Sequence, residues 1–278
     1  MDQPFFTIFT PVYNGEKHIN RVFESINNQT FKNFEWIIIN DGSTDKSQSL
    51  IKSFISQHPE LNLIFIEQEN SGKHIAWNKA VEIAKGQLFI PADADDSFLP
   101  EAFSFFHQKW GTLSLAEQQD LSGINVLCYD NETDKIVGDP FPIDGMKSSN
   151  LELEYKYKIK GEKWGCVRLD LLKTRPFPIV KSSYYPEGYL WLSIAKKYKA
   201  ICINKALRRY FTTYTGISHT PLSERSVNQA KVLIKSSIWF LFNFGLYVLR
   251  YSPKVIYNTL AGIVLNVMVI IRRDLHFN

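Results

Sequence analysis

Residues 89–96 read Phe-Ile-Pro-Ala-Asp-Ala-Asp-Asp, so three carboxylates fall within four positions directly after an apolar run. Neighbouring carboxylates are costly to bury without partners, so such a cluster either is solvated or meets a cation. The spacing of Asp93 and Asp95 puts both on one side of an extended chain, and Mg²⁺ and Mn²⁺ prefer carboxylate oxygens. For this motif alone, an acidic loop that caps a helix is the commoner explanation, so the choice depends on the surrounding sequence.

Strand and helix patterns alternate before this cluster. The apolar, β-rich runs are residues 5–11, 34–40, 61–68 and 87–92, and the helical patterns are 15–29, 46–58 and 74–85. The triple isoleucine of the second run is typical of a strand buried on both faces. We expect Ser43 or Thr44 to cap the second helix and Gly86 to end the third. This order predicts an α/β fold with a mainly parallel sheet and helices on both faces.

Polar motifs follow three of these strands. They are Thr-Pro-Val-Tyr-Asn at residues 10–14, Asn-Asp-Gly-Ser-Thr-Asp at 40–45 and the acidic cluster at 93–96. Because ligands of such sheets bind beyond the carboxyl ends of the strands, we expect the three motifs to meet in one crevice. This convergence favours a ligand site over a solvated acidic loop.

The pattern weakens after residue 100. We expect a strand at residues 122–130, an irregular polar stretch at 131–160, a short helix before Pro176, an amphipathic helix at 189–199 and a strand at 200–211. Near the end of that last strand, Arg208 and Arg209 either meet phosphate or form a solvated strand edge.

Charge and cysteine content bear on nucleic-acid binding and on the cellular compartment of the protein. The net charge of +4 is mild, and no clustered basic residues indicate nucleic acid. Cys128, Cys166 and Cys202 are widely spaced, as expected for free buried thiols in a reducing cytosol. The first residues have no basic region followed by a long apolar core, so we expect no signal peptide and a cytoplasmic protein.

The last part of the chain is apolar and flanked by basic residues. Two apolar segments lie on either side of Arg250 and Lys254, and Arg272 and Arg273 close the second. The second segment is shorter than the roughly 20 apolar residues of a spanning helix. Helices in the membrane interface fit better, so we expect residues 238–273 to contact a membrane surface. A helical pair packed on the domain or on another subunit is the alternative.

The motifs, taken in their order along the chain, match the pattern of a known protein family. The motifs at residues 10–14 and 40–45, the stretch Asn-Ser-Gly-Lys-His-Ile-Ala-Trp-Asn-Lys-Ala at 70–80 and the cluster at 93–96 together resemble the family 2 glycosyltransferases. The resemblance covers about residues 5–215. It implies the GT-A fold and, in bacteria, a role in surface-polysaccharide synthesis such as that of capsule or lipopolysaccharide.

The resemblance implies a binding site for a nucleotide-sugar, typically a UDP-sugar. Asp41 would hydrogen-bond the uracil, because a carboxylate accepts from the ring N–H. The other implied donor-binding residues are Thr10, Pro11, Tyr13, Asn70, Gly72, Lys73 and Asp93.

The resemblance also implies a divalent metal cofactor, Mn²⁺ or Mg²⁺. Asp95 would bind the metal, Asp93 would reach the ribose or the metal's shell, and Asp96 would support the loop. The ion would bridge the diphosphate and neutralise charge on the departing UDP. Many relatives carry a histidine before a serine in a C-terminal segment, whereas His219 here follows the serine. Whether His219 binds metal or phosphate stays open.

Inverting transfer also needs a general base for the acceptor hydroxyl. The family usually has an acidic pair just before a helix of the form W-L-x-x-A. Residues 191–195 here read Trp-Leu-Ser-Ile-Ala, and only Glu187 stands before them. Glu187 is therefore the predicted base, and Asp170 is the fallback for that role. The alternative role for Glu187 is that of a carboxylate placed favourably at a helix N-terminus. Trp164 and Gly165 are expected to line the acceptor pocket, although a core position for Trp164 is equally open.

The predicted protein is a metal-dependent inverting glycosyltransferase with two parts. Residues 1–220 would form the GT-A catalytic domain, with a nucleotide-binding half at 1–100 and an acceptor half at 101–220. Residues 221–278 would form a helical segment associated with the membrane. The expected partners are a nucleotide-sugar donor and a glycan or lipid-linked acceptor at the inner face of the cell membrane, and a homo-oligomer stays open.

Two other functions compete with this prediction. A sugar-phosphate nucleotidyltransferase usually has a Gly-rich, basic loop after its first strand, which residues 10–18 lack. A non-catalytic nucleotide- or glycan-binding module is disfavoured by the intact D-x-D motif and by Glu187.

Overall fold

The computed structural model describes residues 3–180, 184–211 and 221–275. The strands are β1 (Phe6–Val12), β2 (Phe34–Asp41), β3 (Leu63–Gln68), β4 (Leu88–Pro91), β5 (Ser97–Phe98), β6 (Leu121–Asp130), β7 (Met146–Ser148), β8 (Lys163–Arg168) and β9 (Lys199–Tyr210). The helices are α1 (Ile19–Asn27), α2 (Ser47–Gln57), α3 (Lys73–Ile83), α4 (Ala102–Gly111), α5 (Leu115–Asp120), α6 (Leu169–Lys173), α7 (Gly188–Ala195), α8 (Val227–Tyr251) and α9 (Pro253–Leu275), with a π-helical turn, η1, at Glu152–Lys156.

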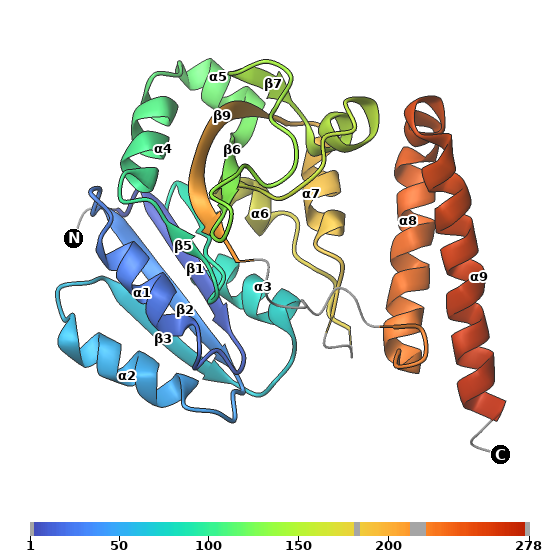
Figure 1. Ribbon diagram of the computed structural model, residues 1–278, viewed down its shortest axis with the longest axis horizontal. Helices are drawn as coiled ribbons and strands as arrows, with labels where there is room; N and C mark the ends of the chain where they lie inside the picture. The colour runs from blue at the N-terminus through green and yellow to red at the C-terminus, as the bar shows by residue number, and fades with distance from the viewer. Residues whose placement is uncertain (1–2, 181–183, 212–220, 276–278) are drawn as a thin grey trace.

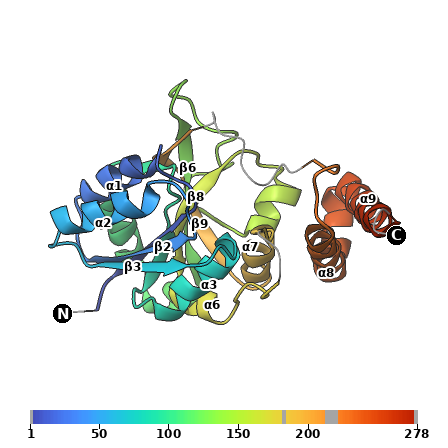
Figure 2. The ribbon, with the colours of Figure 1, turned by 90° about the horizontal axis from the view of Figure 1, so that it is seen from below.

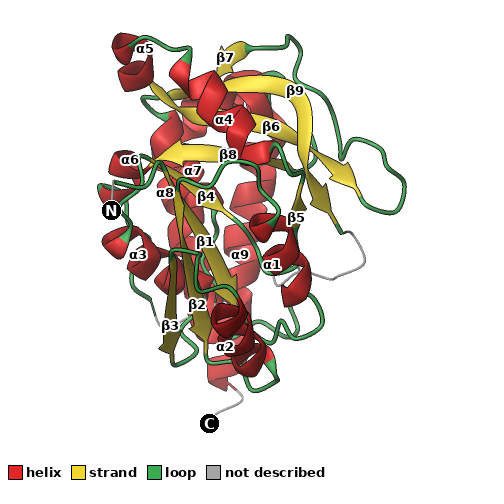
Figure 3. Cartoon of the chain, turned by 90° about the vertical axis from the view of Figure 1, so that its left-hand side faces the viewer, coloured by secondary structure: helices red, strands yellow, loops and turns green. Residues whose placement is uncertain are grey.

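One mixed sheet runs through the α/β part of the molecule. Its strand order is β3-β2-β1-β4-β8-β6-β9-β5, and β7 pairs with β9. The pairs from β3 to β4 are parallel, whereas β8 is antiparallel to both β4 and β6. Figure 3 shows β1, β2 and β3 as one half of the sheet and β6, β8 and β9 as the other. The expected parallel character therefore holds for the first half, and the second half is mixed.

Strand β2 explains why helices cover both faces of the sheet. All of its residues are buried. Trp36 and Ile38 belong to one core cluster, and the alternate residues Ile37 and Ile39 belong to the other. Because successive strand residues point to opposite faces, the apolar run needs cover on both sides. Figure 2 shows α1 and α2 on one side of the sheet and α3 and α6 on the other.

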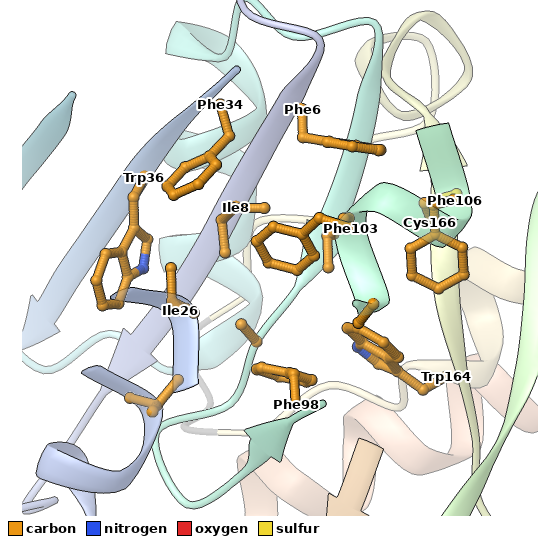
Figure 4. Packing of buried hydrophobic residues seen from close by; sticks show 14 of the residues in the cluster. Phe6, Ile8, Ile26, Phe34, Trp36, Phe98, Phe103, Phe106, Trp164 and Cys166 are labelled. Atoms are coloured by element: carbon orange, nitrogen blue, oxygen red, sulfur yellow. The ribbon is translucent and has the colours of Figure 1, made fainter. Parts of the chain in front are cut away.

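The larger cluster joins the two halves of the sheet. Phe6 and Ile8 of β1 pack in the same cluster as Phe103 and Phe106 of α4. Figure 4 shows that Phe98 and Trp164 continue this packing toward β8. The halves are thus held together by a shared aromatic core.

Several local expectations are corrected. The N-cap of α2 is Lys46, without a side-chain cap, rather than Ser43 or Thr44. Helix α3 ends at Ile83, before Gly86. A Cβ on Gly86 would lie 2.4 Å from the backbone nitrogen of Thr7, so this glycine permits close packing on β1. The stretch expected to be irregular contains β7 and η1. Neither element has a simple side-chain periodicity that would have predicted it.

Helices α8 and α9 form an antiparallel pair beside the α/β part. Figure 1 shows α8 between α7 of the α/β part and α9. Phe244 and Val248 of α8 pack with Leu151, Tyr155 and Leu192 of the α/β part. The boundary expected after residue 220 falls between β9 and α8. By length and composition alone, both helices would be able to cross a membrane.

Candidate active site

The carboxyl ends of β1 and β2 bring two of the polar motifs together. The backbone N–H of Asn14 donates to Ser43 Oγ at 2.9 Å, and the N–H of Thr44 donates to Asn14 Oδ1 at 2.9 Å. The serine and threonine expected to cap α2 therefore fix the loop after β1 instead. This contact forms one wall at the end of the sheet.

Asp41 anchors a third loop to the same edge. Its buried carboxylate accepts hydrogen bonds from Gln68 at 2.7 Å and from the N–H groups of Ser71 and Gly72 at 2.9 Å each. A carboxylate has about four acceptor positions, so one position is left for a ligand N–H. Gly42 has a φ of 72°, and a Cβ there would lie 2.7 Å from Asn70 N, so only glycine allows the loops to approach this closely.

The residues expected around the base and ribose differ in how open they are. Thr10 is fully buried, and its hydroxyl accepts from Trp36 Nε1 at 3.0 Å, so its side chain supports the core. Pro11 is half-buried, whereas Tyr13 and Asn70 are exposed at the rim. Tyr13 and Asn70 are therefore free to contact a ligand, whereas Thr10 has no exposed surface.

The acidic loop follows β4 and is fixed from β8. Trp164 donates its indole N–H to the carbonyl oxygen of Pro91 at 2.7 Å and stacks on Phe98 with ring centroids 4.4 Å apart. Because Pro91 lies two residues before Asp93, this contact sets where the carboxylates begin. Trp164 belongs to the core cluster and also borders the cavity described below, and Phe98 covers one face of its ring.

Lys73 links the acidic loop to the predicted base. Its Nζ lies 2.8 Å from Asp93 Oδ1 and 2.8 Å from Glu187 Oε1. Burial lowers the pKa of Lys73, but the charges of Asp93 and Glu187 outweigh burial and raise it above its usual value. Burial raises the pKa of Asp93, but Lys73 and Arg208 outweigh burial and hold it below its usual value. Lys73 and Asp93 are thus both charged at neutral pH.

Glu187 occupies the N-cap position of α7 but does not cap the helix. Its side chain accepts no capping hydrogen bond and instead meets Lys73. The alternative of a carboxylate that merely serves a helix N-terminus therefore does not describe its main contact. Glu187 faces the same space as Asp93.

Asp96 and Arg208 form a second, buried pair. Arg208 Nε lies 2.7 Å from Asp96 Oδ2, and both side chains are less than a tenth exposed. Burial raises the pKa of Asp96, as do the charges of Asp93 and Asp95, whereas the charge of Arg208 opposes this rise. Of the two alternatives for these arginines, the solvated strand edge is wrong for Arg208. Arg209 does lie at the surface, 3.3 Å from Asp134.

A cavity of about 440 Å³ opens at this point. Its lining includes Lys73, Asp93, Asp96, Gly165, Glu187 and Arg208. A Cβ on Gly165 would lie 1.8 Å from the carbonyl oxygen of Ile124, so glycine is needed for β8 to pair with β6 in the cavity wall. A larger cavity of about 840 Å³ lies at the opposite ends of the parallel strands, and its lining includes Asp170. The fallback base is therefore remote from the acidic loop.

Sequence reasoning missed part of the cavity wall. Asn125 and Asn150 line it, and their amides are hydrogen-bonded to each other at 3.3 Å. Trp191 also lines the cavity and stands edge-on to Trp77. No local motif marks Asn125 or Asn150, since they meet only through the pairing of distant segments. His219 lies outside the described residues.

The carboxylates present fit a divalent cation with few protein ligands. The Asp95 carboxylate accepts no hydrogen bond within the described part of the chain, while Arg21 donates to its backbone oxygen at 2.8 Å. No group of three or more His, Cys, Asp or Glu side chains suited to a metal gathers among the described residues. Asp93 and Asp95 would therefore leave most coordination positions to phosphate and water oxygens, as Mg²⁺ commonly requires.

Comparison with known proteins agrees with the fold and the ordered motifs. Residues 7–110 match the model of glycosyl transferase family 2. A putative teichuronic acid biosynthesis glycosyltransferase, TuaG of Bacillus subtilis, is 25% identical over 223 residues, which cover 78% of this chain and 82% of TuaG.

Two solved structures share the fold. TarS 1–349 of S. aureus, in complex with UDP-GlcNAc, aligns with a TM-score of 0.60 at 21% identity, over 85% of this chain and 66% of that one. The mannosyltransferase PcManGT of Pyrobaculum calidifontis, in complex with GDP-Man and Mn²⁺, aligns with a TM-score of 0.60 at 18% identity, over 96% of this chain and 74% of that one. These are GT-A glycosyltransferases, and the chain shares that architecture. Residues 7–110, which hold the ordered motifs, thus match glycosyl transferase family 2, and the fold of the chain agrees with that match.

Proposed function

We propose that the protein transfers a sugar, with inversion, from a UDP-sugar to a glycan or lipid-linked acceptor in cell-surface polysaccharide synthesis. The observation that carries the proposal is the Lys73 bridge between Asp93 and Glu187. It joins a strand-end acidic loop to a second carboxylate in the wall of one cavity. The names of TuaG and of the TarS complex support a surface polymer and a UDP-sugar, respectively.

The donor's base would bind at the loops that Asp41 joins. The free acceptor position of Asp41 suits the uracil ring N–H, and its other hydrogen bonds keep the carboxylate from turning away. Tyr13 and Asn70 would close the rim. Gly72 allows the loop to pass over the nucleotide without a side chain.

A divalent ion would be held by Asp93 and Asp95 together with the diphosphate. When bound, it supplies charge neutralisation for the departing nucleoside diphosphate. Lys73 is then free to exchange Asp93 for a phosphate oxygen, because its side chain is about one-third exposed. Arg208 stays with Asp96 and keeps the acidic loop in position.

Glu187 would act as the general base. The acceptor oxygen forms a bond to the anomeric carbon as its proton passes to Glu187. The bond from that carbon to the diphosphate oxygen breaks, and UDP leaves with the electron pair. Attack from the face opposite the leaving group inverts the anomeric centre. Asn125, Asn150 and Trp191 would contact the acceptor on the far side of the base.

The first test is calorimetric titration of UDP with and without Mn²⁺, into the wild type and Asp95→Ala. Metal-dependent binding that the variant loses supports the donor site. Screening UDP-sugars for UDP release then identifies the donor. If no nucleotide binds under any metal condition, the transferase proposal is wrong and a non-catalytic module describes the protein better.

A further inference from the structure

The exposed side of α8 changes from basic to apolar along the helix. It begins with Lys231 and Lys235. It continues with an outer stripe, defined here as Ile238, Phe242, Leu246 and Leu249. At 100° per residue these positions fall on the opposite side of α8 from Phe244 and Val248, which pack on the α/β part. Phe242 is 91% exposed and Leu246 is 88% exposed.

Helix α9 is more exposed still. Only 6% of its most apolar stretch is buried. Its large exposed apolar residues are Tyr257, Leu260, Val264, Leu265, Val267, Met268 and Ile271. The buried polar residue of the helix, Asn266, accepts a hydrogen bond from Arg225 at 3.1 Å on the inward side. Exposed apolar area on this scale marks a surface that meets a partner or a membrane.

The charges of this segment favour an anionic partner. Between Arg225 and Arg273 the sequence has no Asp or Glu. Its basic residues are Arg225, Lys231, Lys235, Arg250, Lys254, Arg272 and Arg273. Because α8 and α9 are antiparallel, Arg250 and Lys254 gather at the turn, and Lys231 and Arg272 gather at the other end. Basic residues that flank an apolar face complement anionic lipid headgroups on either side of the buried area.

The packing of α8 distinguishes a helix that lies on a membrane from a helix that crosses it. Trp239 packs on Tyr189 with ring centroids 4.4 Å apart, and Phe240 packs on Tyr155 at 5.7 Å. Ser252, just past the end of α8, donates its hydroxyl to the carbonyl oxygen of Tyr155 at 2.9 Å. These contacts hold most of the helix against the polar α/β part. A spanning α8 would draw that part into hydrocarbon, where unpaired polar groups are costly.

The spacing of the charges agrees with this reading. The stretch between Lys235 and Arg250 rises only about 22 Å at 1.5 Å per residue, whereas the hydrocarbon core of a bilayer is roughly 30 Å thick. Helix α9 packs along α8, so the orientation of one helix sets that of the other. The pair fits the plane of the membrane surface and not its normal.

The same segment of chain lies under α8 and at the cavity. Leu151 and Tyr155 pack against α8, while Leu153 and Glu154, from the same turns, line the 440 Å³ cavity. The hairpin is therefore separated from the acceptor side of the cavity only by η1 and by α7, whose Leu192 packs on α8 while Trp191 lines the cavity. A surface that docks the hairpin also lies close to the acceptor.

We infer that the α8–α9 hairpin lies flat on an anionic lipid bilayer and holds the acceptor side of the cavity beside it, which selects a lipid-linked acceptor. The choice of acceptor rests on the proposed function, whereas the docking stands on the hairpin alone. A second copy of the chain is the other occupant that the apolar face would fit, and the test separates the two.

The docking is tested by flotation of the full chain with two kinds of vesicle. One kind is phosphatidylcholine, and the other is phosphatidylcholine mixed with phosphatidylglycerol. We expect binding to the mixed vesicles that weakens with salt, and a loss of about tenfold or more in the Phe242→Glu/Leu246→Glu double variant. The matched control is Leu115→Glu/Ile143→Glu, which places the same changes at exposed positions of the α/β part and should bind as the wild type does.

The orientation is tested by depth measurement with spin labels on single cysteines introduced along α8 and α9. Burial raises the pKa of Cys128, Cys166 and Cys202 to about 12, and all three are buried, so they should stay unlabelled. A flat hairpin gives depths that oscillate with the helical period and stay within about 10 Å of the headgroups. Depths that rise to one maximum at mid-helix on every side would overturn the flat orientation.

Two further outcomes decide the remaining alternatives. Wild-type dimers in the absence of lipid, lost in Phe242→Glu/Leu246→Glu, together with no flotation, would show that a second copy covers this face. UDP titration of the same variant keeps the two proposals apart. If the wild type floats but binds no nucleotide, the proposed function is wrong and the docking stands. If the wild type binds UDP but does not float, the docking is wrong and the proposed function stands.

Discussion

Lys73 and Arg208 both pair with carboxylates of the loop at residues 93–96, but the two pairs differ in their surroundings. The Lys73 and Asp93 side chains are 36% and 34% exposed, whereas those of Arg208 and Asp96 are 7% and 4% exposed. An exposed pair contributes little to stability and can be exchanged for a ligand. A buried pair that loses one partner leaves an uncompensated charge. One loop therefore combines a fixed support with an exchangeable contact.

Removing Asp96 should have the strongest effect on stability. Asp96→Ala leaves the buried guanidinium of Arg208 without its nearest carboxylate, and arginine does not lose its proton in proteins. We expect the free energy of unfolding to fall by about 3–5 kcal/mol in urea titrations. The double variant Asp96→Ala/Arg208→Met should recover part of the loss. Equal stability of the two variants would contradict a pair held by charge.

Glu187→Gln tests the base on the exchangeable side of the loop. The amide keeps the size of the side chain but cannot accept the proton, so kcat should fall by about 10²–10⁴-fold. UDP affinity measured by calorimetry should stay unchanged. Asp170→Asn, at the opposite cavity, is the control and should keep wild-type kcat. A fall in both variants would point to a general loss of folding.

Lys73→Met sharpens the contrast with Asp96. The pair is partly solvated, so the free energy of unfolding should change by less than about 1 kcal/mol. KM for the donor should rise roughly tenfold, because a charged hydrogen bond to phosphate is lost. Lys73→Arg keeps the charge and should lie closer to the wild type. A loss of stability as large as that of Asp96→Ala would remove the distinction between the two pairs.

The exposed pair of Arg209 and Asp134 should contribute least to the free energy of unfolding. Asp134→Asn removes the charge of a surface partner 3.3 Å away and keeps a residue type that tolerates the φ of 54° at this position. Thermal unfolding should detect a change of at most about 0.5 kcal/mol, with activity unaltered. A larger change would mean that this region of β9 depends on charge beyond its surface.

The first half of the fold was predictable because its side chains repeat with clear periods. The run of residues 34–40 is β2 within one residue, and residues 74–85 mark α3 closely. Strand β8 was not predicted, since Lys163–Arg168 carries too few apolar residues in alternation. The cap of α2 was misassigned because Ser43 and Thr44 bond to the loop after β1, and such a long-range contact has no local signal.

The sequence marks some single residues around the candidate cavity but not the contacts that join them. The sequence indicates Asp93 and Glu187 separately, and only the fold brings Lys73 between them. The burial of Arg208 was equally hidden, because two adjacent arginines near a strand end suggest solvent. Tertiary packing decided that one of them turns inward and the other does not.

The hydrogen bond from Trp164 to Pro91 has a consequence for exchanging parts between relatives. The segment that matches the family, residues 7–110, ends well before Trp164, yet the start of its acidic loop is set by that indole. A chimaera that joins residues 7–110 to the second half of a relative would inherit the motifs at residues 10–14, 40–45 and 93–96 and lose the contact that aligns the acidic loop. Under the proposed function, donor binding would be encoded in one half of the chain and would depend on the other half for its alignment.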